Sequence, residues 1–355
     1  MKRFVHLLFS GLKWLILTLL AVELFSFLII MGSNYLIYGQ VRDCDPVRYD
    51  PYTLFVSEGA PRPTANNPPS ADRQKYRLIW LFGGSTLKGA TDDDAKTIPS
   101  FLARDLNQTE PLWPSYLINF GEPSFNSLME TKYLGKAMIE QPALPDLIIF
   151  YDGANDCTYF SQNRTPDAHL GYRRLRGLIE SYHHSYFGFL KPFYAALYAS
   201  FTNELYAKIR QGVIPIKAGD PQLLKFVDSV EKRYDYVNKV AQGFGANFLL
   251  FWQPFWWVET GQVAPAITQK EEVSLPKYMA IRQNFEVTYN ALADRLKNKP
   301  YFIDYRNVLC GRTQPVYQDD GIHLQDRGRE MVAAQIAHYL KASRFYPAAA
   351  GGRSR

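Results

Sequence analysis

Three residues in this chain have the types and the spacing needed to activate a serine hydroxyl. Asp320 precedes His323 by three residues, so one tight turn can present both side chains on the same side. Neutral histidine is the usual base for a hydroxyl nucleophile, and a carboxylate fixes the tautomer of the imidazole. Ser85 follows two glycines, which let a turn expose its hydroxyl. The three residues together could form a serine nucleophile activated by a histidine base, although each motif alone is more often an ordinary turn.

Two further residues could stabilise the negative charge that such a reaction develops. Gly121 ends an apolar run, and a glycine there lets a backbone N–H approach a ligand closely. Asn155 follows another apolar run, and its side-chain amide can donate to an oxyanion. Taken singly, Gly121 could be a common strand-end glycine and Asn155 part of an Asx turn.

Short apolar runs before these motifs predict the strands that position them. Such runs suit strands that are covered on both faces of a sheet. The expected strands are Tyr76–Phe82, Tyr116–Phe120, Leu147–Tyr151, Asn247–Trp252 and Tyr301–Asp304.

Helical patterns alternate with these strands. The expected helices are Ile98–Leu106, Ser127–Glu140, Pro221–Gln242, Lys277–Lys297 and Gln325–Ala342. Strands alternating with helices predict an α/β fold, here a three-layer α/β/α flavodoxin-like sandwich with a mainly parallel five-stranded sheet. Sites in such sheets form at the carboxyl ends of the strands, which is where the motifs fall.

The order of the four motifs resembles that of the SGNH (GDSL-like) hydrolase superfamily over about residues 76–342. The resemblance implies Ser85 as nucleophile, His323 as base and Asp320 as its orienting acid. It also implies an oxyanion hole of Ser85, Gly121 and Asn155, with no metal or organic cofactor. The commonest first motif of the family has Asp where this chain has Gly84, which leaves the subfamily open.

The N-terminus predicts a membrane anchor over residues 14–38. Trp14 to Met31 is an 18-residue apolar run broken only by Glu23, and about 20 apolar residues cross a bilayer. A cleaved signal peptide would have a shorter apolar stretch and a small-residue cleavage site. Basic residues within 1–13 put that segment in the cytoplasm, so the catalytic domain is expected on the extracytoplasmic (periplasmic) side of the inner or plasma membrane.

Glu23 is costly at mid-membrane, which indicates either a membrane-protein partner or a protonated carboxyl on a lone helix. Residues 39–75 contain many prolines, which predicts an extended tether. Residues 76–345 form the expected hydrolase domain, and 346–355 a flexible tail. Within the domain, 158–219 is rich in Tyr and Phe and is expected to be a helical insertion, serving as lid, platform, membrane-contacting flap or plain packing.

Three cysteines, Cys44, Cys157 and Cys310, are too few for a disulfide scaffold and lack metal-ligand spacing. A bridge between Cys157 and Cys310 is one hypothesis, because both follow strands of the expected active face. Two separately buried thiols are the alternative. The net charge of +6 does not indicate nucleic acid as a partner, since the basic residues are scattered.

These features predict a serine esterase or O-acyltransferase that removes or transfers acetyl or other acyl groups on an extracytoplasmic polysaccharide or glycoconjugate. The alternatives are a lipid-directed esterase or thioesterase, and a non-catalytic, membrane-tethered scaffold that kept the fold. Hydrolase and transferase use the same residues, so the motifs do not separate them.

Overall fold

The computed structural model describes residues 2–38, 47–69, 72–184, 187–210, 214–272, 279–318 and 320–346. The chain divides into two compact units. One comprises Met1–Pro46 with Gly171–Gly212, and the other Val47–Leu170 with Val213–Arg355. Cys44 and almost all of the predicted tail (347–355) lie outside the described residues.

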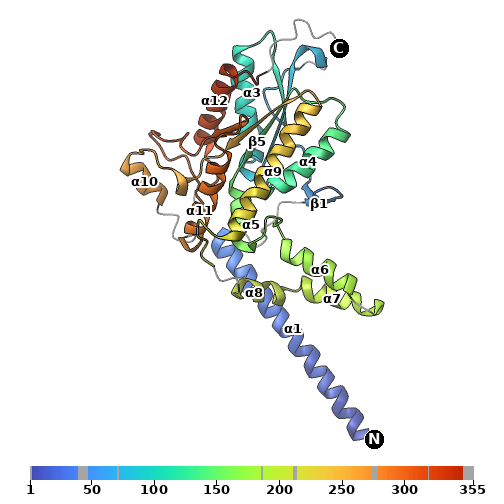
Figure 1. The fold of residues 1–355 in the computed structure, drawn as a ribbon. Helices are drawn as coiled ribbons and strands as arrows, with labels where there is room; N and C mark the ends of the chain where they lie inside the picture. Colours follow the sequence, from blue (N-terminus) through green and yellow to red (C-terminus); the bar gives the residue numbers. More distant parts are fainter. Residues whose placement is uncertain are drawn as a thin grey trace. The chain divides into compact units, whose positions relative to one another are not determined.

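The larger unit is built on a five-stranded parallel sheet (Figure 1). Its strand order is β4-β3-β5-β6-β7, which is the order 2-1-3-4-5 of flavodoxin-like sheets. The expected fold class is therefore confirmed. Every strand lies within one residue of its predicted bounds: β3 (Arg77–Gly83), β4 (Ser115–Asn119), β5 (Leu147–Asp152), β6 (Asn247–Trp252) and β7 (Phe302–Asp304).

Helices cover both faces of this sheet. Alternate side chains of each strand point to opposite faces and are buried under these helices. Ile79 and Leu81 share a core with α3 (Ile98–Thr109) and α12 (Asp326–Ala342). Trp80 and Phe82 belong to the opposite core. The helices of that second face are α4 (Ser127–Glu140), α5 (Ala154–Asn163), α9 (Pro221–Gly243) and α11 (Met279–Leu296).

Residues 47–69 do not form the extended tether that their prolines predicted. Strands β1 (Val47–Asp50) and β2 (Leu54–Ser57) pair as an antiparallel hairpin. Asn67 then bonds with its side chain to both the N–H and the carbonyl of Leu117, each at 2.8 Å. Leu117 lies on β4, the edge strand of the sheet. Proline excluded helix here, but it left the segment free to cover an open sheet edge.

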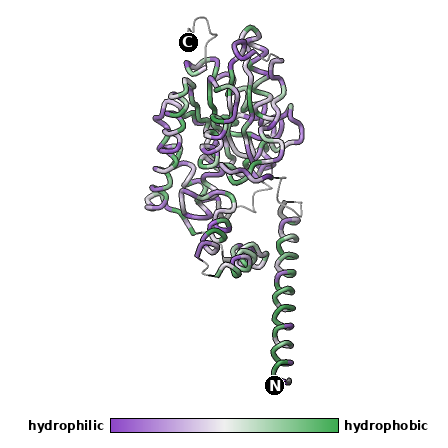
Figure 2. Tube along the Cα trace, turned by 90° about the vertical axis from the view of Figure 1, so that its right-hand side faces the viewer, coloured by the Kyte–Doolittle hydropathy of each residue, from purple (hydrophilic) through white to green (hydrophobic). Residues whose placement is uncertain are grey.

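The smaller unit contains a long apolar helix, α1 (Lys2–Tyr38), which is hydrophobic along most of its length (Figure 2). By length and composition, Arg3–Leu36 can cross a membrane, as a membrane anchor or a signal sequence would. Among its described residues, the unit also contains three α-helices of the predicted insertion: α6 (Tyr172–His184), α7 (Lys191–Ala199) and α8 (Phe201–Arg210).

The insertion begins later than residue 158. Residues 158–163 continue α5, and Phe160 is fully buried in the core of the larger unit. The segment that groups with α1 starts at Gly171. The aromatic content of 158–170 therefore reflects the core of the α/β unit and not the insertion.

Candidate active site

Ser85, His323 and Asp320 form a continuous hydrogen-bonded chain. The Oγ of Ser85 lies 2.7 Å from Nε2 of His323. The Nδ1 of the same ring is hydrogen-bonded to Oδ2 of Asp320. A base that contacts a hydroxyl on one side and a carboxylate on the other has the arrangement that proton removal from serine requires.

Asp320 is held in place by its own turn. Its Oδ1 accepts hydrogen bonds from the backbone N–H groups of Ile322 and His323, both at 2.9 Å. Burial would by itself raise the pKa of the Asp320 carboxyl, but the bonds from the His323 ring and these N–H groups hold that pKa below its usual range. Asp320 therefore stays ionised and fixes Nδ1 as the protonated nitrogen.

Ser85 and Asn155 come from neighbouring strands at the point where the strand order reverses. Ser85 is the first residue of α2 (Ser85–Lys88) after β3, and Asn155 lies in the first turn of α5 after β5. β3 and β5 pair in parallel, so their carboxyl ends lie side by side. This switch point is where ligands bind in open α/β sheets.

The amide of Asn155 approaches the serine turn closely. Its Nδ2 donates to the carbonyl of Phe125 at 2.6 Å, which leaves the second amide hydrogen for another acceptor. A Cβ at Gly84 would come within 2.5 Å of this Nδ2. The turn at Gly84 therefore packs directly against the Asn155 amide.

Gly121 also lies at the site, but its N–H has an acceptor in its own loop. It donates to Oδ1 of Asn119 at 2.9 Å. A Cβ at Gly121 would come within 2.5 Å of the Lys88 backbone nitrogen, so the position needs glycine for close packing against α2. Its role as an oxyanion donor stays a prediction, because the bond to Asn119 would have to be exchanged for substrate.

Sequence reasoning missed a buried ion pair behind the serine. Lys88, the last residue of α2, lies 3.7 Å from the Glu122 carboxylate and is hydrogen-bonded to the hydroxyl of Ser57. Glu122 in turn accepts from the Ser57 N–H at 3.1 Å. The three residues come from three distant segments, so no local pattern signals their contact. They join the hairpin to the serine helix and to the loop of Gly121.

The loop that carries His323 rests on a second buried ion cluster, also missed from sequence. The Arg312 guanidinium donates to both carboxylate oxygens of Glu259 (2.9 and 3.1 Å) and of Glu271 (2.6 and 3.2 Å). Glu271 also accepts from the N–H of Val316 at 2.9 Å. Residues 316–318 pair back onto 323–325, so the cluster holds the segment against which His323 lies.

Three buried carboxyl groups lie beneath the turn that carries Asn155. Asp156 accepts from the N–H and the hydroxyl of Ser127, and Asp152 accepts from the hydroxyl of Tyr234 at 2.9 Å. Glu130 is fully buried beside them. Burial, and next the negative charge of Asp152, raises the pKa of Glu130 well above its usual range. Burial therefore favours the protonated form of Glu130.

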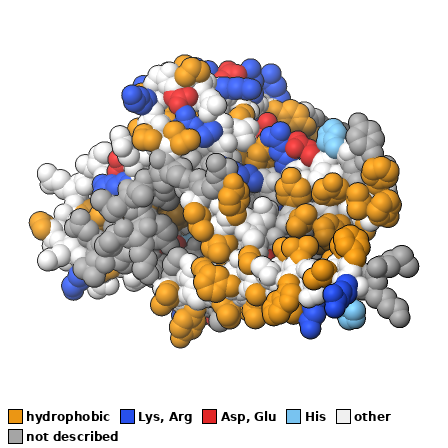
Figure 3. All heavy atoms as spheres, turned by 90° about the horizontal axis from the view of Figure 1, so that it is seen from below, with side chains coloured by type: hydrophobic (Ala, Val, Ile, Leu, Met, Phe, Trp, Pro, Cys, Tyr) orange, Lys and Arg blue, Asp and Glu red, His pale blue; other side chains and the backbone are white. Residues whose placement is uncertain are grey.

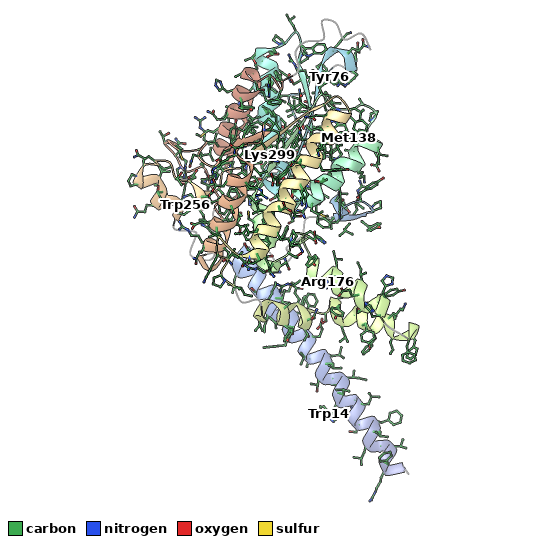
Figure 4. All side chains as sticks on the ribbon, in the orientation of Figure 1. Trp14, Tyr76, Met138, Arg176, Trp256 and Lys299 are labelled. Atoms are coloured by element: carbon green, nitrogen blue, oxygen red, sulfur yellow. The ribbon has the colours of Figure 1, made fainter. Side chains whose placement is uncertain are left out.

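A cavity of about 600 Å³ lies beside the loop of His323. Its lining includes Trp256 and Arg282, and the Arg282 guanidinium lies over the Trp256 ring, 5.8 Å from its centroid. The backbone N–H of Trp256 donates to the carbonyl of Gly321, which lies between Asp320 and His323 in the turn. Figure 4 shows Trp256 on the segment that leads towards α10 (Pro265–Glu272).

The proposed disulfide is wrong, since Cys157 and Cys310 are both free thiols. Cys157 points into the core on α5 and is fully buried, whereas Cys310 is partly exposed in the loop after β7. The two loops do start from the same edge of the sheet, but α5 turns Cys157 inward. Within the described ranges, no three His, Cys, Asp or Glu side chains are arranged to hold a metal ion.

Comparisons with known proteins find likeness only among solved structures. No family model and no curated protein matches the chain. An inhibitor-bound aryl esterase of M. smegmatis is 14% identical, with 75% of this chain and 99% of that chain covered and a TM-score of 0.40. A lipase/acylhydrolase from Enterococcus faecalis is 17% identical, with 75% and 96% covered and a TM-score of 0.41.

A two-domain esterase active on acetylated mannans is 14% identical, with 80% of this chain and 53% of that chain covered and a TM-score of 0.41. At such low identity and TM-scores, these proteins say nothing about the substrate of this chain. What the chain itself shows is a flavodoxin-like sheet, with three of the four motifs at strand ends and the fourth in the loop before α12, as the sequence predicted.

Proposed function

We propose that this protein is a serine esterase or O-acyltransferase that uses Ser85, His323 and Asp320. The observation that carries the proposal is the 2.7 Å contact between Ser85 Oγ and His323 Nε2, with Asp320 on the other ring nitrogen. A non-catalytic scaffold has no need to keep a nucleophile and a base in hydrogen-bond contact.

The reaction would proceed in two halves. Ser85 Oγ attacks the carbonyl carbon of an ester while His323 takes its proton, and the Asn155 amide with the Ser85 N–H stabilises the oxyanion. The tetrahedral intermediate then expels the alcohol, which receives the proton from His323. Water, or a hydroxyl of an acceptor, attacks the acyl-enzyme in the same way and releases Ser85.

For the substrate we infer an acylated polysaccharide or glycoconjugate. The cavity beside the His323 loop supports this choice, since Trp256 offers an aromatic ring for a sugar face and Arg282 a donor for its oxygens. A lipid-directed esterase or thioesterase is the second candidate. It is favoured by the exposed aromatic side chains of the insertion, such as Phe189 and Phe193.

The triad is tested by replacing its members singly and together. Ser85→Ala and His323→Ala should each abolish turnover of p-nitrophenyl acetate, and the double variant should lose little more, because the residues act as one unit. Ser85→Ala should also end labelling by a fluorophosphonate.

Ser343→Ala is the matched control, because this serine lies past the far end of α12. It should keep both labelling and turnover. Near wild-type turnover by Ser85→Ala would refute the assignment of the nucleophile. Acetate release measured against transfer to an added oligosaccharide would then separate hydrolase from transferase.

We also propose that the larger unit lies outside the cytoplasm, with α1 as an uncleaved anchor. Lys2, Arg3 and Lys13 support this orientation by the positive-inside rule. A C-terminal alkaline phosphatase fusion should be active, and a C-terminal GFP fusion exported by the general pathway should be dark. The opposite pair of results would exclude surface polymers as substrates.

A further inference from the structure

Glu23 of α1 caps the N-terminus of another helix of the same unit. Its carboxylate accepts hydrogen bonds from the backbone N–H groups of Phe201 (2.7 Å) and Thr202 (3.0 Å) and from the Thr202 hydroxyl (2.7 Å). The rings of Phe27 and Phe201 meet edge to face, 5.0 Å apart. The first turn of α8 is thus fixed to α1 at the level of Glu23.

The length of α1 places this contact within a membrane. Arg3–Leu36 has 34 residues and is about 51 Å long at about 1.5 Å per residue. The hydrocarbon core of a bilayer is about 30 Å thick and takes about 20 residues of helix. Every window of that length within Arg3–Leu36 includes Glu23 or ends beside it. If α1 spans the membrane, the first turn of α8 lies at the depth of the hydrocarbon core.

This placement explains why a carboxylate stands in an apolar span. The first N–H groups of a helix have no partner within the helix, and water does not reach them in hydrocarbon. Glu23 accepts from two of them in α8. A polar residue inside a span usually faces another protein element, and here that element belongs to the same chain.

The residues before α8 expose the side chains expected of a segment in lipid. Figure 3, viewed towards the end at which α1 begins, shows hydrophobic side chains gathered on this face. Beyond Lys191, α7 has no charged residue. The large apolar side chains that are more than half exposed here are Phe187 (60%), Phe189 (77%), Phe193 (66%) and Leu197 (52%).

Basic residues lie on α6 beside this apolar segment, and one lies within it at the start of α7. Arg173, Arg174 and Arg176 lie on α6, which packs against α7, and Lys191 begins α7 with its ammonium over the ring of Tyr182. Long basic side chains at the edge of an apolar surface reach towards lipid phosphates. α7 has nine residues and α8 ten, so neither can cross a bilayer.

We propose that residues 187–202 enter the apolar part of the bilayer beside α1 and return without crossing it, with α6 at the headgroup level. The partner of this surface is lipid. Inside the membrane, Glu23 caps the N-terminus of α8. The proposal concerns the smaller unit and stands apart from the chemistry of Ser85.

Spin labels on the full-length protein in vesicles of phosphatidylcholine and phosphatidylglycerol test it. The three native cysteines are replaced by alanine, and single cysteines are placed by Phe189→Cys or Phe193→Cys. Leu112→Cys is the matched control, because Leu112 is an apolar residue of the larger unit that is 97% exposed. Leu20→Cys on α1 gives the reference for lipid.

Spin labels at 189 and 193, like the one at 20, should be more accessible to oxygen, which dissolves in lipid, than to a water-soluble nickel chelate. The label at 112 should be more accessible to the nickel chelate. Labels at 189 and 193 that behave like the one at 112 would overturn the proposal. Protection from both reagents would overturn it as well, since it would indicate a protein partner. Turnover of p-nitrophenyl acetate, measured on each variant, reports separately on the esterase.

The cap is tested by Glu23→Leu and Glu23→Gln. A label at Ile209→Cys on α8 should become more mobile in Glu23→Leu, which removes every acceptor. Glu23→Gln keeps one carbonyl oxygen and should restore part of the order. Equal mobility in the wild type and Glu23→Leu would contradict the cap.

Discussion

The two sides of the site rest on buried charges that are neutralised in opposite ways. On the side of His323, Arg312 is shared between two carboxylates, and all three side chains are almost fully buried. On the side of Asn155, Glu130 lies beside Asp152 and Asp156, and Arg233 pairs with Asp156 at 3.8 Å. In the first cluster an opposite charge compensates the carboxylates, whereas in the second burial favours the protonated form of a carboxyl.

This difference determines what each side is sensitive to. A buried ion pair that loses one partner leaves the other charge without compensation, so the His323 side depends on the identity of Arg312. A carboxyl kept neutral by burial gains a charge when the pH rises, so the Asn155 side depends on pH.

Removing Arg312 should have the largest effect on stability. Arg312→Ala leaves Glu259 and Glu271 facing each other in the interior, and should destabilise the fold by about 3–5 kcal/mol. Thermal unfolding of the full-length variant and wild type in detergent measures this loss of stability. The folded fraction should also lose turnover, because the segment 316–318, against which His323 lies, is released.

Arg327→Ala is the control for that prediction. Arg327 also pairs with a glutamate, Glu330 at 3.1 Å, but it is 64% exposed. Exposed pairs contribute little, so this variant should unfold like the wild type. Equal losses in the two variants would mean that the buried cluster has no special role.

On the other side of the site, Asn155→Ala should act on the reaction. The amide stabilises charge that develops in the transition state, so kcat should fall by about 10²–10³ while KM barely changes. Steady-state kinetics with p-nitrophenyl acetate measures both constants.

Asn163→Ala, at the other end of the same helix, is the matched control. Its amide donates to a backbone carbonyl of α5 and should leave kcat unchanged. A rise in KM without a fall in kcat for Asn155→Ala would show instead that Asn155 binds the substrate in its ground state.

Glu130→Gln should have the smallest effect, and one that depends on pH. The folded pKa of Glu130 is raised above the ordinary value of 4.5, so the folded state holds a proton that the unfolded state releases. Stability therefore falls as pH rises from about 4.5 towards the folded pKa, by up to about 1.4 kcal/mol per pH unit. Glutamine resembles the protonated carboxyl. The stability of the variant relative to the wild type should therefore increase as pH rises.

Unfolding midpoints measured from pH 4 to pH 8 check this prediction. Glu140→Gln is the control, since Glu140 ends the same helix and its side chain is 52% exposed. Parallel curves for the wild type and Glu130→Gln would mean that Glu130 does not carry the proton.

The sheet and its major helices could be predicted because each strand and helix has a recognisable pattern within its own short stretch of sequence. Each strand is a short run of apolar residues, and α4 has the bounds that its helical pattern predicted. The contacts between Ser85, His323 and Asp320 were predicted for a related reason. Parallel strands end at one edge of a sheet, which brings motifs together that are distant in sequence.

What could not be predicted depends on contacts between distant segments. Ser57, Lys88 and Glu122 meet only after folding, and so do Glu130 and Asp152. The disulfide hypothesis failed for the same reason. It placed two loops at one edge correctly but could not give the direction of one side chain on α5.

The segment before the sheet sets the limit to which the chain can be shortened. Arg62 donates from its guanidinium to the carbonyls of Lys88, Gly89 and Thr91, at 3.1, 2.8 and 2.7 Å, where the serine helix ends. A soluble fragment that starts at Tyr76, the first residue of the predicted domain, would leave these carbonyls to water. It would also remove Ser57 from the pair of Lys88 and Glu122. Recombinant fragments for crystallography or assay should therefore begin no later than Val47.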